Sequence, residues 1–233
     1  MARVARAEDI AAKRNAILAA AQRLVLTKGY QHMSVQDILV DLQISGGAFH
    51  HYFDSRGALL EGLIDRIQED SGKPLLPIIH NPHLSAIAKL QGFLSTLDRL
   101  RVERQQDVLA ALRVWYTDAN AVVRQRVDDA IFLQRAPMLA EIVRQGVREG
   151  VFTVTSPERA GEVVMALLQA LGDTEARLLL TVAEEPGRCI EQFLATHAAY
   201  LEAIERVLGA APNSLERGDA EAVTPWVMAL GSH

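Results

Sequence analysis

The chain has 233 residues, of which 49% are apolar and 5% aromatic, and its formal net charge at pH 7 is -5. This length and apolar content allow one or two domains with a substantial hydrophobic core. A single cysteine, Cys189, excludes an intramolecular disulfide and suits a reducing compartment. No leader sequence opens the chain, and no apolar run approaches the roughly 18 residues of a membrane-spanning helix. We therefore expect a cytoplasmic protein that does not contact a membrane.

Basic residues gather at the beginning of the chain, although the protein as a whole is acidic. Residues 1–28 contain only two acidic side chains, Glu8 and Asp9, and six basic ones: Arg3, Arg6, Lys13, Arg14, Arg23 and Lys28. A basic stripe needs only to face the phosphates, so a negative net charge does not exclude nucleic-acid binding. The first part of the chain is therefore a candidate for that role.

Apolar residues recur with the helical period along almost the whole chain, and no stretch alternates convincingly as a strand would. This pattern predicts an all-α fold of about nine helices. The first helix should run from about Glu8 to Lys28 and end at Gly29, since glycine commonly terminates a helix. Arg3 and Arg6 would precede this helix as a flexible arm.

Two short helices joined by a tight turn are predicted within residues 34–53. Ser34 and Ser45 are suitable N-caps for the two helices. Ala48, Phe49 and Phe53 would form the buried stripe of the second helix. That leaves four of its residues facing outward, where a groove of DNA would lie: Gly47, His50, His51 and Tyr52. This arrangement is typical of a helix-turn-helix DNA reader.

The remaining helices are predicted to form a link and a larger body. A helix over residues 55–70 connects a small head, residues 1–57, to a body, residues 74–209. Prolines within residues 73–83 mark the boundary between them. The body helices are expected near residues 84–100, 103–117, 120–149, 157–180 and 186–208.

Three features of the body carry further predictions. Pro137 should kink or break its helix, because proline removes a backbone donor and crowds the carbonyl four residues earlier. Residues 210–233 have mixed composition and are predicted to be a loosely held tail. The helix over residues 157–180 is apolar nearly all round and needs partners on several sides. With the helix over residues 186–208 it is the predicted dimer interface, through Val164, Leu168, Leu171, Phe193, His197 and Leu201.

Residues 34–59 carry a spaced pattern that includes Ser34, Ile38, Ile44, Ser45, Gly47, His51, Tyr52, Phe53, Ser55 and Leu59. The pattern resembles the head of the TetR family of one-component transcriptional repressors, with Arg56 in the place of a lysine. Leu39 and Leu42 replace small alanines, Gln43 replaces the turn glycine and His50 replaces a tyrosine. A left-handed backbone at Gln43 would cost about 1 kcal/mol.

The resemblance implies a homodimer that presents two recognition helices to a palindromic double-stranded operator, represses transcription and releases DNA when a small-molecule effector binds. Phosphate contacts are expected from Lys28, Ser34, Ser45, Tyr52 and Arg56, since such groups give affinity without sequence choice. Base edges are expected to be read by Gln36, Gln43, His50 and His51. Gly46 and Gly47 would let the backbone approach the duplex.

The resemblance also places an effector pocket between the helices over residues 84–149 and the helix over residues 157–180. The candidates there are Phe93, Leu97, Arg113, Trp115, Tyr116, Phe132, Met165 and Gln169. Most of them should prove to be ordinary core, because aromatic residues at helical spacing usually are. Arg113 could neutralise an acidic ligand if it points inward. No cofactor is expected.

Other functions stay open at this point. An all-helical enzyme is the first rival, although no Ser/His/Asp or Cys/His set, glycine-rich phosphate loop or metal-spacing motif supports it. His50 and His51 are unsuited to bind one ion, since neighbours on a helix diverge by about 100 degrees. The second rival is a DNA-binding regulator controlled by a protein partner. The pattern does not distinguish repression from activation.

Overall fold

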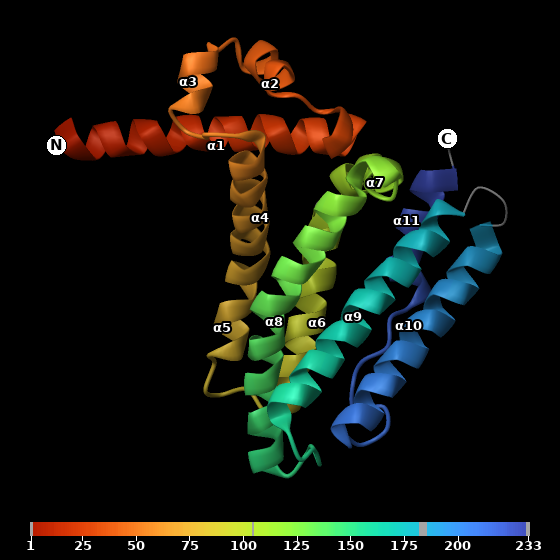
Figure 1. The fold of residues 1–233 in the computed structure, drawn as a ribbon. Coiled ribbons are helices and arrows are strands. Elements are labelled where there is room, and N and C mark those ends of the chain that lie inside the picture. Colours follow the sequence, from red (N-terminus) through yellow and green to blue (C-terminus); the bar gives the residue numbers. More distant parts are fainter. Residues whose placement is uncertain (1, 104, 182–185, 232–233) are drawn as a thin grey trace. The chain divides into compact units, whose positions relative to one another are not determined.

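The computed structural model of the protein describes residues 2–103, 105–181 and 186–231, and these ranges are helical without any strand. Contacts divide the chain into two compact units (Figure 1). The first unit comprises Met1–Glu69 and Arg113–Val127, and the second comprises Asp70–Leu112 and Asp128–His233. The all-α prediction is confirmed. Among the described residues, no helix is long and apolar enough to cross a membrane.

The first unit is built on one long helix, α1 (Ala2–Lys28). Two short helices, α2 (Val35–Leu42) and α3 (Gly46–His50), lie together along one side of α1 (Figure 1), and α4 (Arg56–Gly72) begins in this unit. The buried side chains at the centre of the unit are Ile17, Leu18, Val25, Met33, Ile38, Phe49, Phe53, Leu59 and Leu63. Burial of these apolar groups holds α2 and α3 in place.

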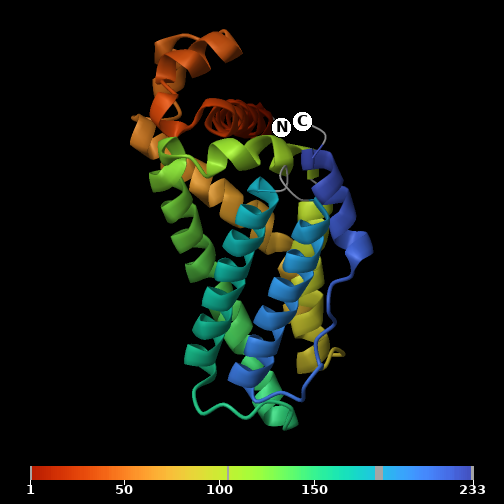
Figure 2. The same ribbon diagram turned by 90° about the vertical axis from the view of Figure 1, so that its right-hand side faces the viewer.

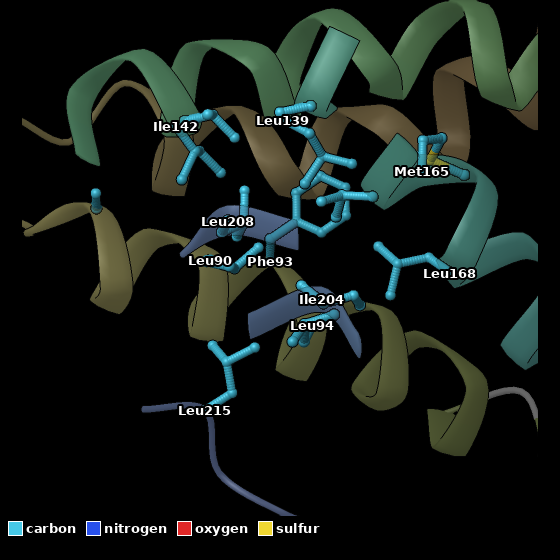
Figure 3. Packing of buried hydrophobic residues seen from close by; sticks show 14 of the residues in the cluster. Leu90, Phe93, Leu94, Leu139, Ile142, Met165, Leu168, Ile204, Leu208 and Leu215 are labelled. Atoms are coloured by element: carbon cyan, nitrogen blue, oxygen red, sulfur yellow. The ribbon is translucent and has the colours of Figure 1, made fainter. Parts of the chain in front are cut away.

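The second unit is a bundle of long helices. It contains α6 (Ala86–Glu103), most of α8 (Ala121–Glu149), α9 (Pro157–Leu180) and α10 (Pro186–Leu208). Helices α9 and α10 run side by side along their length (Figure 2). Side chains from all four helices meet in one core, where Phe93, Leu139, Met165 and Ile204 point toward one another (Figure 3).

Each of the nine predicted helices has a counterpart in the structure, and α7 (Gln105–Trp115) completes that set. Two further helices were not predicted: α5 (Leu76–Ile79) and α11 (Ala220–Gly231). Helix α1 begins at Ala2, so the prediction that Arg3 and Arg6 precede it as a flexible arm is wrong. Their side chains lie outside the described part of the chain.

The prediction of a break near Pro137 is wrong, because α8 runs through this proline without interruption. Proline frees the carbonyl of Leu133 from its helical hydrogen bond. Pro137 is exposed and Leu133 keeps 73% of its surface accessible. Water can therefore replace the lost donor, and the helix continues.

The prediction of a loosely held tail is also wrong. Helix α11 packs on α10 and α9, and Val223 and Val227 are buried. The chain before α11 is held by Glu205, a buried carboxylate on α10. Glu205 accepts hydrogen bonds from the backbone N–H groups of Asn213 (3.2 Å) and Leu215 (2.9 Å). It also accepts one from the Arg217 guanidinium at 2.8 Å.

We expect Glu205→Gln to lower the free energy of unfolding at pH 7 by about 1 to 2 kcal/mol, because hydrogen bonds to a charged acceptor are stronger than neutral ones. Burial by itself raises the pKa of Glu205, but the hydrogen bonds from Leu215, Arg217 and Asn213 outweigh it and hold the pKa below its ordinary value. The stabilisation is therefore complete above the pKa of the unfolded chain and is lost as the pH falls through the folded pKa.

Urea unfolding of both proteins at several pH values measures this difference. It should be largest near neutrality and should shrink below about pH 4.5. A difference that grows in acid would contradict the assignment.

Candidate nucleic-acid interface

Hydrogen bonds define both the start of α2 and the turn that follows it. Ser34 and Asp37 form a capping box: the Asp37 N–H donates to Oγ of Ser34 (3.2 Å), and Oδ2 of Asp37 accepts from the Ser34 N–H (2.6 Å). After α2, Gln43 adopts the left-handed conformation expected from the sequence, with φ 53° and ψ 42°. The Ile44 N–H then bonds to the carbonyl of Leu39 at 3.1 Å.

Helix α3 buries one side and exposes the other. Its N-cap Ser45 accepts a hydrogen bond from the N–H of Ala48 at 3.2 Å. Phe49 and Phe53 are buried, with ring centroids 5.9 Å apart. The predicted base readers are all exposed: Gln36, Gln43, His50 and His51. Their side chains are therefore accessible to a nucleic acid.

The two predicted basic phosphate contacts also have partners inside the first unit. Nζ of Lys28 lies 2.6 Å from Oδ2 of Asp37, and this contact and Ser34 hold the pKa of Asp37 well below its ordinary value. The guanidinium of Arg56 lies 4.0 Å from the ring centroid of Tyr30 and donates a hydrogen bond to the Tyr30 carbonyl. Lys28 thus holds α2 against the end of α1, and Arg56 holds the start of α4 against Tyr30. Both residues have this structural role in addition to any contact with DNA.

Two other basic side chains near the helix-turn-helix are engaged in exposed ion pairs. Arg23 lies 2.7 Å from Asp41 of α2, and Lys13 lies 2.7 Å from Asp9. Such surface pairs contribute at most about 1 kcal/mol. Phosphate groups can therefore replace these carboxylates at little cost.

Asn120 is a buried residue of the first unit, and the sequence did not predict the hydrogen bonds that its side chain forms. Its Nδ2 group donates to the carbonyls of Val25 (3.1 Å) and Val114 (3.1 Å), and its Oδ1 accepts from the Tyr30 N–H at 2.7 Å. Residues 113–127 are thereby joined to α1, although the predicted boundary placed them in the body. A lone asparagine carries no local pattern that could have indicated these distant partners.

Two family models match the sequence. Residues 17–63 match the model of bacterial regulatory proteins of the tetR family, and residues 109–177 match the model of the tetracyclin repressor-like C-terminal domain. The chain belongs to the TetR family of transcriptional regulators. The first match covers the helix-turn-helix and the second runs from α7 to α9. No curated protein sequence matches the chain significantly.

Solved structures share the TetR fold with this chain at low sequence identity. The SmeT–triclosan complex is 15% identical, with a TM-score of 0.63 over 90% of this chain and 97% of the other. The reduced form of NemR from E. coli is 15% identical, with a TM-score of 0.58 over 86% and 99%. MbdR from Azoarcus sp. CIB is 22% identical, with a TM-score of 0.51 over 85% and 98%.

The predicted effector residues of this TetR-family protein are divided between the two units. Arg113, Trp115 and Tyr116 belong to the first unit, where Arg113 is exposed. Arg124 donates to the carbonyl of Trp115 at 2.7 Å and lies 5.1 Å from the ring centroid of Tyr116. The three residues therefore share no compact unit with the other candidates.

The other five effector candidates belong to the second unit. Phe93 and Met165 are buried in its core, so almost none of their surface is accessible to a ligand. Leu97 and Phe132 are half-buried at the edge of that core. Nε2 of Gln169 donates to the carbonyl of Asp128 at 2.7 Å, which links α9 to α8. Leu97 and Phe132 keep the accessible surface that a ligand contact requires.

Most of the predicted dimer contacts lie inside the protomer. Val164, Leu168, Leu171 and Leu201 are all buried within the chain's own fold. They cannot also contact a second copy, because their surface is already used. Phe193 is half-buried, and His197 bonds through Nδ1 to Glu175 at 2.9 Å. The helix over residues 157–180 was correctly predicted, but the residues of its outer face were not identified.

Proposed function

We propose that this TetR-family protein is a homodimeric repressor that binds a palindromic operator and leaves it when a small-molecule effector binds. The observation that carries the proposal is the exposed side of α3. Helix α3 buries Phe49, while Gly47 and His50 of the helix and its C-cap His51 are exposed. Polar groups that the fold does not use, held on a helix anchored by its other side, are suited to read base edges.

The dimer is proposed to form through the outer faces of α9 and α10. On α9 this face carries Val163, which is 45% exposed, together with Ala166, Leu167, Ala170 and Thr174. On α10 the neighbouring face carries Thr196, Ala199, Tyr200, Ala203 and Val207. We name these ten residues the α9/α10 face. None of them is charged, and small side chains allow two helix pairs to approach closely.

Selection of binding sites from a pool of random double-stranded DNA tests the proposal. We expect an inverted repeat whose half-sites are centred about one helical turn apart, since two related recognition helices occupy successive major grooves. The affinity should fall steeply with salt concentration, because phosphate contacts release counterions. Selection of no sequence, or a flat salt profile, would refute the proposal.

Two substitutions separate the reading of bases from the binding of phosphates. His50→Ala should lower affinity for the selected sequence about tenfold or more while leaving non-specific binding unchanged, because a lost base contact costs about 1 to 3 kcal/mol. Tyr52→Phe removes only a hydroxyl and should weaken selected and random DNA alike, by about fivefold. Fluorescence anisotropy with both DNAs measures the two effects.

The two variants serve as controls for each other, since both substituted residues lie at the end of α3 and neither is fully buried. Circular dichroism should show that both proteins keep the wild-type Tm. If His50→Ala weakened both DNAs equally, His50 would not be a base reader. If Tyr52→Phe changed nothing, its hydroxyl would not contact a phosphate.

Effector control requires a ligand that binds the DNA-free conformation more tightly than the DNA-bound one. The chain crosses between the two units after Glu69, Leu112 and Val127, so a change in the second unit has three covalent routes to the first. Control by a protein partner is the rival. Sedimentation of the purified chain separates the two, because a homodimer occupies the α9/α10 face and a monomer leaves it free.

A further inference from the structure

Five charged or titratable side chains from four helices gather inside the second unit. They are Asp98 and Arg101 of α6, Arg135 of α8, Glu175 of α9 and His197 of α10, and we name them the charged cluster. Four of the five are paired with one another. Nη1 of Arg101 lies 3.4 Å from Oδ1 of Asp98 and 3.4 Å from Oε2 of Glu175. Nδ1 of His197 lies 2.9 Å from Oε1 of Glu175.

Arg135 is the exception within the charged cluster. It forms no ion pair or hydrogen bond with any residue that the structure describes, and its buried Nε has no acceptor. Burial, and then repulsion by the charge of Arg101, lower the pKa of Arg135 to about 10. The guanidinium is therefore still charged at neutral pH. A charge held largely away from water without a partner among the described residues is costly, so an anion that reached this guanidinium would stabilise it.

The acids of the charged cluster are not available to supply that anion. Glu175 is buried and already bonded to both Arg101 and His197. Burial, acting against the nearby charges of Arg101 and His197, raises the pKa of Asp98, whose carboxylate pairs with Arg101. Both carboxylates bond to Arg101 or His197, and neither forms an ion pair with Arg135.

Each of the two arginines has an apolar residue one helical turn earlier on its own helix. Phe132 precedes Arg135 by three residues on α8, and Leu97 precedes Arg101 by four on α6, so each lies one helical turn away. Both are half-buried against the core. On α9, Gly172 lets the Arg101 guanidinium approach the helix closely, since a Cβ there would lie 3.2 Å from Nη2 of Arg101. A charge at the edge of an apolar core suits a ligand with one anionic end.

We propose that the second unit binds an organic carboxylate whose charged group pairs with Arg135 and whose apolar body packs toward Phe132 and Leu97. This inference rests on the proposed function, because it assigns a chemical class to the effector. A carboxylate offers two acceptor oxygens that match the paired donors of a guanidinium. A neutral or cationic ligand would leave the charge of Arg135 without a partner.

Thermal unfolding of the full chain without DNA tests the site. The probe is benzoate at about 10 mM, and its neutral isostere benzamide is the control. Benzoate should raise Tm by about 2 °C or more and benzamide should not. Arg135→Met keeps the volume and removes the charge, so it should abolish the benzoate shift without lowering the Tm of the ligand-free protein. Arg101→Met should lower that Tm, because it removes the ion pair of Asp98 and leaves the buried Glu175 with His197 alone.

Three results would overturn the inference: equal shifts with benzoate and benzamide, a benzoate shift retained by Arg135→Met, or a lower ligand-free Tm for Arg135→Met. In a second arm, benzoate should weaken binding of the selected DNA about tenfold in the wild type and not in Arg135→Met. An unchanged DNA affinity in the wild type would refute the effector role. Failure to select any DNA would refute the proposed function and leave the unfolding result standing.

Discussion

A Gly161→Ala protein is expected to unfold at least about 5 °C below the wild type. Gly161 is buried on α9, where the helix crosses the backbone of α8. A Cβ at this position would lie 2.6 Å from the backbone nitrogen of Ala140 and 2.9 Å from the carbonyl oxygen of Ala136. Because backbone atoms cannot rotate away as a side chain can, α8 and α9 would have to separate. We expect a net loss of about 2 kcal/mol or more, even after the gain in helix propensity.

Gly57→Ala is the matched control for this substitution. Gly57 also lies in a helix, but it is exposed, and a Cβ there would come no closer than 3.5 Å to the Ser55 hydroxyl. Alanine at this position should leave Tm unchanged or raise it slightly. Calorimetry of both variants measures the difference. An unchanged Tm for Gly161→Ala would mean that α8 and α9 do not approach each other as closely as described.

Glutamate at Ala166 is expected to separate the dimer and to lower operator affinity by about 100-fold or more. Ala166 is exposed at the centre of the α9 part of the α9/α10 face. Residues at the centre of a twofold interface lie near their own copies across the axis, so the proposed dimer would bury two carboxylates close together without a partner. A monomer binds a single half-site and loses the gain from bivalent binding.

Leu133→Glu is the control, because Leu133 is another exposed apolar residue and lies on α8, outside the α9/α10 face. This protein should stay dimeric and bind the operator normally. Sedimentation velocity and fluorescence anisotropy measure the two properties. A dimeric Ala166→Glu protein would place the interface elsewhere, and a monomer with full operator affinity would show that dimerisation is not needed for binding.

Local sequence features were sufficient to predict the helix-turn-helix. Ser34 and Ser45 were identified as N-caps, and both accept the expected hydrogen bonds. The spacing predicts Phe49 and Phe53 in the core, and both are buried there; Gln43 keeps the left-handed conformation of the turn although it replaces a glycine. These features depend on residues within a few positions of one another, so propensity, spacing and capping chemistry determine them.

Partners that are distant in sequence account for what was missed. Asn120 bonds to Tyr30 across 90 residues and to Val25 across 95, and this joins residues 113–127 to the first unit. Glu205 holds the segment before α11 through backbone donors eight and ten residues further on. A single polar residue gives no periodic signal, so only the folded chain reveals what it binds.

The amino-acid pattern alone was enough to predict the helical class, the helix-turn-helix head and the resemblance to the TetR family. The folded chain decided which side of α9 faces inward. A helix that is apolar nearly all round has no preferred orientation, because hydrophobic burial has no direction. Packing against α8 and α10 turned Val164 and Leu168 into the core and left Val163 and Ala166 outside. The same packing buried Nε of Arg135 without an acceptor among the described residues, a property of the assembled bundle that no local stretch of sequence encodes.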